Sequence, residues 1–79
     1  MQGQLLLQLD TFTLLANQLT VERKRQGLSR SQAASVCNVS MSFIRDAETQ
    51  PGRCSLAKLS QVINGLGLTM VVTGWQAEP

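Results

Sequence analysis

SRSQAASVCNVSMSFIRDAE, the stretch from Ser29 to Glu48, organises the rest of this 79-residue chain. Ser29 suits the N-cap of a short helix over residues 30–37, and Ser40 suits the N-cap of a second helix over residues 41–48. Asn38, between them, is the residue after glycine that best tolerates a left-handed backbone. The stretch therefore predicts two short helices joined by a tight turn.

The apolar residues of this stretch fall on one side of each predicted helix. Ala33, Ala34 and Cys37 form the inner face of the first helix, Val39 packs inward at the turn, and Phe43 or Ile44 with Ala47 forms the inner face of the second. The outer face is polar and holds Ser40, Met41, Ser42 and Arg45. Two helices with this patterning are typical of a helix-turn-helix DNA reader.

A first helix is predicted before this stretch, from Phe12 to Gln26. Asp10 and Thr11 favour N-cap geometry, basic residues occupy the predicted last turn, and Gly27 is expected to end the helix. Its apolar face is expected to hold Phe12, Leu15, Leu19 and Val21, with Leu28 entering the core next. Residues 1–10 have no clear helical or strand period and are interpreted as an apolar arm, Leu5 to Leu9, which needs a cover.

After a loop over residues 49–54, Ser55 is expected to cap a fourth helix from Leu56 to about Leu66, which Gly67 ends. Its apolar face is Leu56, Leu59, Val62, Ile63 and Leu66. The next residues are rich in β-branched side chains and predict one strand within residues 68–74, before a tail over 75–79. A lone strand leaves backbone groups unpaired, so we expect it to pair with a second copy across a two-fold axis. The predicted dimer interface is Leu68, Thr69, Met70, Val71, Val72 and Thr73.

The size and composition of the chain favour a single small domain without catalytic machinery. Seventy-nine residues hold one core, and the chain has neither His nor Tyr. Cys37 and Cys54 are too few for a disulfide framework and lack further zinc ligands, so reduced thiols are expected. We therefore expect no enzyme activity, no metal and no cofactor.

The charge distribution is compatible with a surface that faces phosphate. All seven basic residues lie within residues 23–58, where they meet two acidic residues, a net charge of +5 for this window. A basic solvated surface without a partner has the same pattern. No long apolar run and no basic leader are present, so a cytoplasmic, nucleoid-associated bacterial protein is expected.

These motifs resemble the Cro-repressor-like (XRE) helix-turn-helix family, and most of all the antitoxins that partner HipA-type kinase toxins. The resemblance covers about Leu15 to Val72 and rests on LANQL, the R(x)3GLS segment from Arg23, Ala34, the NVS turn, Ile44 and Glu48, and the GLGLTMVV ending. It implies a mainly α, four- to five-helix, lambda-repressor-like domain with one C-terminal strand pairing across a dimer. It also implies an ion pair between Arg23 and Glu48.

The function implied by this resemblance is that of a sequence-specific repressor acting on a palindromic operator. The chain would also restrain a HipA-like kinase toxin and repress the operon of a toxin-antitoxin module. Two alternatives stay open: a protein-interaction module that does not read DNA, and a phage or restriction-system repressor without a toxin. The chain departs from the family at Arg30, where Gln is usual, and at Asn38, where Gly is common. Ala33 and Ala47 replace bulkier residues and predict looser helix packing.

Several exposed residues are candidates for DNA contacts, each with a plainer interpretation. Arg45 is predicted to reach a base edge, or else to pair with Glu48 or solvent. Ser40 and Ser42 could bind phosphate or bases, although Ser40 is equally a helix cap. Arg30 is a candidate for phosphate or base contact, because a cation at a helix N-terminus costs about 0.3–1 kcal/mol unless something repays it.

Three further residues complete the candidates. Met41 could contact a thymine methyl or have no role, and Arg53 could contact phosphate or be an ordinary surface charge. Trp75, the only Trp, could fold back on the strand or anchor a partner protein.

Overall fold

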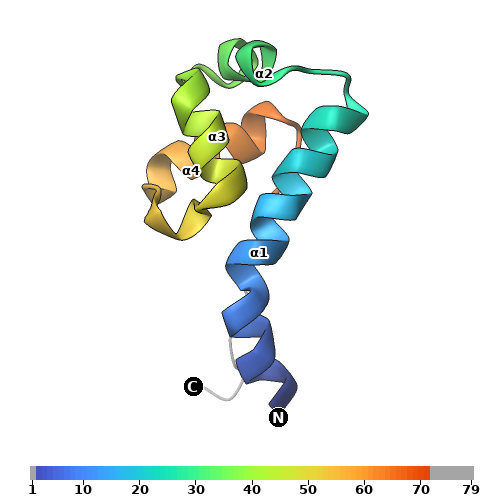
Figure 1. The fold of residues 1–79 in the computed structure, drawn as a ribbon, viewed down its shortest axis with the longest axis vertical. Coiled ribbons are helices and arrows are strands. Elements are labelled where there is room, and N and C mark those ends of the chain that lie inside the picture. Colours follow the sequence, from blue (N-terminus) through green and yellow to red (C-terminus); the bar gives the residue numbers. More distant parts are fainter. Residues whose placement is uncertain (1, 72–79) are drawn as a thin grey trace.

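The computed structural model describes residues 2–71, with side chains from residue 11 onward. Within this range the protein is mainly α-helical, as predicted, and no residue is in a strand (Figure 1). The elements are α1 (Gln2–Arg25), α2 (Arg30–Cys37), α3 (Met41–Thr49), a 3-10 turn η1 (Pro51–Arg53) and α4 (Leu56–Gly65). The predicted strand and tail beyond Val71 lie outside the described residues.

The long helix α1 begins ten residues earlier than predicted. It is continuous from Gln2 to Arg25, so residues 2–10 are helical rather than a separate arm. Leucine and glutamine are good helix formers, and Asp10 and Thr11 favour a cap without forcing one when the helix can continue through them. At about 1.5 Å per residue, 24 helical residues extend about 36 Å. Figure 1 shows the N-terminal part of α1 extending beyond the other helices.

Three helices end in the same way, in a Schellman arrangement around a left-handed residue. That residue is Gly27 after α1, Asn38 after α2 and Gly67 after α4, with φ of 73°, 59° and 82°. In each case the next residue donates its N–H to a carbonyl five positions back: Leu28 to Arg23, Val39 to Ala34, and Leu68 to Ile63. An apolar residue at this position usually packs back on its helix, and all three pack against the core.

The three helix starts predicted from serine are confirmed. The Ser29, Ser40 and Ser55 hydroxyls accept hydrogen bonds from the backbone N–H of Gln32, Phe43 and Lys58. At Ser29 the Gln32 side chain also accepts from the Ser29 N–H at 2.8 Å, which completes a capping box. Side chains adjacent to each turn therefore fix where α2, α3 and α4 begin.

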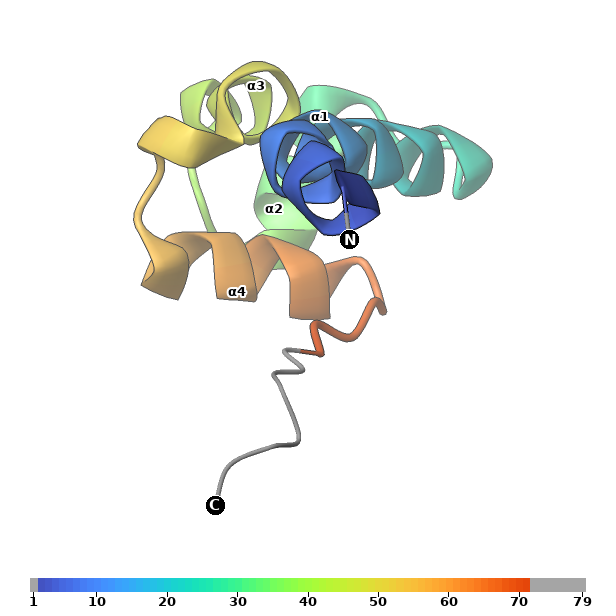
Figure 2. The same cartoon turned by 90° about the horizontal axis from the view of Figure 1, so that it is seen from below.

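The core lies between the C-terminal half of α1 and the other three helices, and Figure 2 shows α4 on the opposite side from α1 and α3. Its buried members come from all four helices and the residue after α4: Leu19, Ala33, Ala34, Cys37, Ile44, Ala47, Leu59, Val62, Ile63 and Leu66. The inner faces predicted for α2 and α3 are confirmed, with Ile44 buried and Phe43 half-buried.

Three residues assigned to the core by periodicity are exposed instead. Phe12 is 55% exposed, Val21 is 59% exposed and Leu56 is 65% exposed. Val21 lies on the side of α1 away from Leu19 and Arg23, which face the core. Phe12 and Leu56 share the apolar faces of their helices, but they lie near the edge of the bundle, where little covers them.

The small residues under the helix-turn-helix unit are buried in the core, and the looser packing predicted from them stays a prediction. Ala33 and Ala47 are fully buried. A Cβ added at Gly65 of α4 would lie 2.7 Å from Cys37 Sγ and 3.0 Å from Cys37 Cα of α2. Such a distance is shorter than van der Waals contact, so a larger residue at this contact between α2 and α4 would force neighbouring atoms to shift.

Candidate nucleic-acid interface

The candidate interface is formed by α2, α3 and the turn between them. The left-handed Asn38 turns the chain sharply after α2, and Ser40 caps α3 two residues later. The inner side of α3 is anchored by Ile44, 1% exposed, and Ala47, fully buried. Because one side of α3 is fixed against the core, its other side faces solvent as a rigid surface.

The solvent side of α3 carries the residues predicted to read DNA. Met41 is 57% exposed, and Ser42 and Arg45 are exposed as well. Ser42 and Arg45 are three residues apart and therefore lie on one face of the helix. The structure thus places these three predicted residues together on a single exposed surface.

Ser40 acts as a helix cap and keeps a donor for another partner. Its hydroxyl oxygen accepts from the Phe43 N–H at 3.0 Å. A serine hydroxyl has one O–H donor besides its acceptor sites, so capping leaves the donor available to a phosphate. The two roles considered for Ser40 are therefore compatible.

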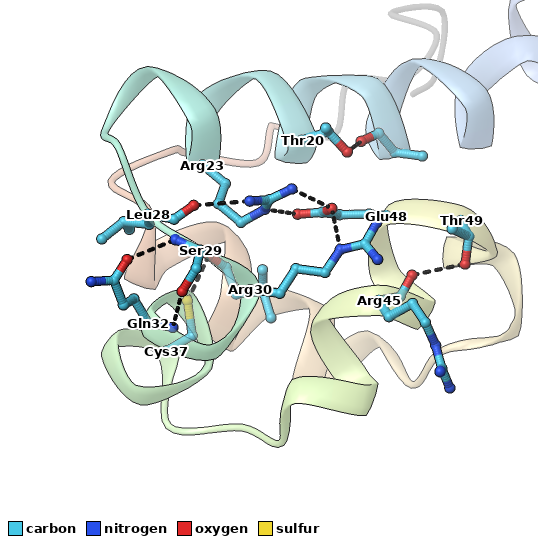
Figure 3. A network of polar contacts seen from close by, with 12 residues as sticks. Thr20, Arg23, Leu28, Ser29, Arg30, Gln32, Cys37, Arg45, Glu48 and Thr49 are labelled. Carbon is cyan, nitrogen blue, oxygen red and sulfur yellow. Dashed lines mark hydrogen bonds and ion pairs between the residues drawn. The ribbon is translucent and has the colours of Figure 1, made fainter.

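Arg45 does not pair with Glu48, which was one of the two plainer alternatives for this residue; the other, a solvated charge, stays open because the side chain is exposed. Its nearest acid is its neighbour Asp46, at 3.8 Å between Arg45 Nε and Asp46 Oδ1, and both side chains are about half exposed or more. Such an exposed pair contributes little. Figure 3 shows the Arg45 side chain directed away from the Glu48 carboxylate. The guanidinium is therefore accessible to a ligand.

Glu48 instead lies at the centre of a network that joins three helices (Figure 3). Arg23 of α1 donates from Nε to Glu48 Oε2 at 2.6 Å and from Nη2 to Oε1 at 3.1 Å. Its Nη1 donates to the Leu28 carbonyl at 2.8 Å. The ion pair implied by the family resemblance is confirmed, and it is buried: the Arg23 side chain is 10% exposed and that of Glu48 is 3% exposed.

A second arginine, Arg30 of α2, joins the same carboxylate. Arg30 Nε donates to Glu48 Oε1 at 3.1 Å, and its side chain remains 40% exposed. Burial raises the pKa of Glu48, but the hydrogen bonds and charges of Arg23 and Arg30 outweigh it and hold that pKa below its ordinary value of 4.5. Glu48 is therefore ionised at neutral pH.

The Glu48 contact gives a structural reason for a cation at the start of α2. The first turn of α2 contains no acidic residue that would offset the charge of Arg30. Glu48 supplies that negative charge from α3, 18 residues away in sequence. The unfavourable position of Arg30 therefore does not by itself indicate a DNA contact. Sequence reasoning missed this pair, and the only signal for it was the absence of a local partner.

The remaining predicted contact, Arg53, lies on η1 and has no bond to the residues of this network. It is exposed, and its Nη1 donates to Gln50 Oε1 at 3.2 Å. Arg23 is buried, but its positive charge is balanced by the negative charge of Glu48, which is buried with it. Burial of this pair therefore does not reduce the net positive charge at the surface of the region. Removing one positive and one negative charge leaves the net charge of residues 23–58 unchanged.

The predicted dimer segment is described only from Leu68 to Val71. Leu68 is half-buried and donates its N–H to Ile63, so its backbone donor is already used within the chain. Thr69, Met70 and Val71 are exposed and make no backbone hydrogen bond to another described residue. With Leu15, Gln18 and Ile63 they border a hollow of about 340 Å³. Val72, Thr73 and Trp75 lie outside the described residues.

Neither cysteine forms a disulfide within the described range. Cys37 is buried, which raises the pKa of its thiol, and Cys54 is half-buried beside the core. Among residues 11–71, whose side chains the structure describes, no group of three or more His, Cys, Asp or Glu could hold a metal ion. No helix within residues 2–71 is both long and apolar enough to cross a membrane.

Comparisons of this chain with family models, with curated proteins and with solved structures found no match.

Proposed function

We propose that this protein is a sequence-specific DNA-binding repressor that inserts α3 into the major groove. The observation that carries this proposal is the division of α3 into two faces. Ile44 and Ala47 fix it to the core, while Met41, Ser42 and Arg45 occupy the exposed side of the second helix of a two-helix unit. A major groove is about 12 Å wide and admits an α-helix presented in this way.

The side chains on this surface match the chemistry of a base edge and its adjoining phosphates. Arg45 can donate two hydrogen bonds to guanine O6 and N7, which is the commonest specific contact in such complexes. The Ser40 hydroxyl, at the N-terminus of α3, can donate to a phosphate where free backbone N–H groups also attract an anion. Arg53 on η1 is proposed as a further phosphate contact.

A single copy of α3 reads only half a site, so the proposal includes a homodimer. Thr69, Met70 and Val71 are exposed and lack backbone partners among the described residues, which favours pairing with a second copy. A two-fold axis through such a pair would place two α3 helices in successive major grooves, about 34 Å apart. Replacing Val71 with Asp should then halve the mass measured in solution. An unchanged dimer mass would exclude this segment as the interface.

The test of DNA reading is a selection from a pool of random-sequence duplexes with the full chain. We expect enrichment of a two-fold symmetric sequence whose half-sites are about 10 base pairs apart, centre to centre. Binding without enrichment of any sequence would contradict a sequence reader. The absence of binding at low salt would favour the alternative of a protein-interaction module.

The partner we propose beyond DNA is a HipA-like kinase toxin, and this part rests on the sequence resemblance alone. The antitoxin would bind the toxin and repress the operon that encodes both. A pull-down with the product of the neighbouring gene, with and without operator DNA, tests it. A neighbouring phage or restriction gene, and no captured kinase, would favour a repressor without a toxin.

A further inference from the structure

Arg30 uses only one of its three donor nitrogens within the described chain. Its Nε is bound to Glu48 Oε1 at 3.1 Å, while neither of its two Nη groups bonds to any other residue of the described chain. The side chain is 40% exposed, whereas the Glu48 side chain is 3% exposed. The Nε group is therefore held by a buried carboxylate, while the Nη groups have no partner in the described chain on a side chain that is 40% exposed.

Glu48 is itself held in place, so it can orient Arg30. Both of its oxygens are bound by Arg23, and Arg23 is further fixed by its bond to the Leu28 carbonyl. The three side chains carry two positive charges and one negative charge, so the cluster presents a net positive charge to an incoming anion. A guanidinium is planar and can use one edge for a carboxylate and another for a phosphate oxygen.

We propose that Glu48 is a positioning residue for DNA binding, which holds Arg30 through Nε so that its Nη groups clamp a backbone phosphate. This inference rests on the proposed function, and it adds that the ion pair persists in the complex. Arg30 then reaches DNA without first breaking its pair with Glu48. The loss of side-chain freedom on binding is smaller, because the side chain is already held in the free protein.

The decisive variant is Arg30→Lys, which keeps the charge but removes this geometry. An ammonium group carries its three donors on one nitrogen at the end of a flexible stem, so it does not hold a carboxylate and a phosphate in the fixed planar geometry of a guanidinium. The matched control is Arg25→Lys, because Arg25 is likewise an exposed arginine that pairs with a glutamate, Glu22, and has no assigned contact with DNA. Both variants keep the net charge of the protein.

The readout is the affinity for a selected duplex, measured by fluorescence anisotropy between 50 and 200 mM salt. One phosphate contact contributes about 0.9 to the salt slope, which is about a 3.5-fold change in affinity over this range. We expect Arg30→Lys to lose most of this contribution, nearly as much as Arg30→Ala, while Arg25→Lys keeps the parent slope. Wild-type slope and affinity in Arg30→Lys would overturn the inference.

A double-mutant comparison separates positioning from general stabilisation. Glu48→Gln should weaken DNA binding several-fold when Arg30 is present and by less than about twofold in the Arg30→Ala background. Equal weakening in both backgrounds would assign Glu48 a structural role only and overturn the inference. If Glu48→Gln does not fold, as judged by circular dichroism, the Arg30→Lys result decides alone. No duplex binding by the parent protein would instead refute the proposed function, and with it this inference.

Discussion

Replacing Arg23 with methionine should remove a large part of the stability of this protein. The change deletes two hydrogen bonds to Glu48, at 2.6 and 3.1 Å, and one to the Leu28 carbonyl. Removing one partner of a buried ion pair typically costs 3–5 kcal/mol, because the other charge stays buried. Arg30 still contacts Glu48, so we expect the lower end, about 3 kcal/mol. The total free energy of unfolding of a domain of this length is about 4–12 kcal/mol.

The matched variant is Arg30→Met, which removes the other arginine of the same carboxylate. Its side chain is 40% exposed and makes one bond to Glu48, so we expect a loss of at most about 1 kcal/mol. The double variant Arg23→Met with Glu48→Met should recover part of the loss, because no charge is left unpaired.

Urea unfolding followed by circular dichroism at 222 nm, at pH 7 and one protein concentration, measures all these variants. The concentration must be fixed, since association would change the apparent stability. If Arg30→Met lost as much stability as Arg23→Met, or if Arg23→Met lost less than about 1 kcal/mol, the buried pair would not be the main tie between α1 and α3.

Three further predictions concern the same core and its helix ends. The pKa of Glu48 is lower in the folded protein than in the unfolded chain. The contribution of the ionised Glu48 to the free energy of unfolding is therefore fully present above about pH 4.5, and it is lost as the pH falls through the lowered pKa. Urea midpoints between pH 3 and 7 should therefore fall more steeply for the parent than for Glu48→Gln, and parallel curves would contradict this. Gly65→Ala should lower the free energy of unfolding by about 1–2 kcal/mol, because the added Cβ would lie 2.7 Å from Cys37 Sγ. Adding Cys37→Ala should restore part of this loss. A Gly65→Ala variant more stable than the parent would refute the close contact. Asn38 has a φ of 59°, so Asn38→Val should lower the free energy of unfolding by about 1–2 kcal/mol, whereas Asn38→Gly should leave it nearly unchanged. Equal thermal midpoints for the two variants would exclude backbone strain as the cause.

The parts of the fold predictable from the sequence are those set by neighbouring residues. Serine hydroxyls capping the next helix placed the starts of α2, α3 and α4, and the left-handed preference of Asn38 placed the turn. These effects act over three or four residues, so the sequence contains all the participants. The bounds of α2, residues 30–37, were predicted without error for this reason.

The parts that were not predictable depend on distant residues. Periodicity placed Phe12 and Leu56 on apolar faces, but only the other helices determine how far the cover extends along each face. The start of α1 depended on whether its helix continued through Asp10, where cap preference and helix propagation compete. Gly65 is the last residue of α4, and its close approach to Cys37 of α2 is visible only in three dimensions.

In the candidate site, too, the features set by neighbouring residues were predictable and the contacts between distant residues were not. The sequence placed Met41, Ser42 and Arg45 together on one face of α3, because their spacing is local. It did not show that Arg30 shares the Glu48 carboxylate with Arg23, since that network joins residues 18 and 25 positions apart. Pairing of the segment after α4 involves a second chain and stays a prediction.

The proposed reading of base edges by α3 depends above all on Arg45, so Arg45→Ala is the variant that examines it. The matched control is Arg25→Ala, which removes an exposed arginine in the last turn of α1 that pairs with Glu22. The measurement is the ratio of affinities for a selected duplex and for a duplex with the guanine of its half-site exchanged. We predict that Arg45→Ala reduces this ratio by about 5- to 150-fold, corresponding to about 1–3 kcal/mol, while Arg25→Ala leaves it unchanged. An unchanged ratio in Arg45→Ala, or an equal loss in both variants, would contradict the assignment of Arg45 as a base reader.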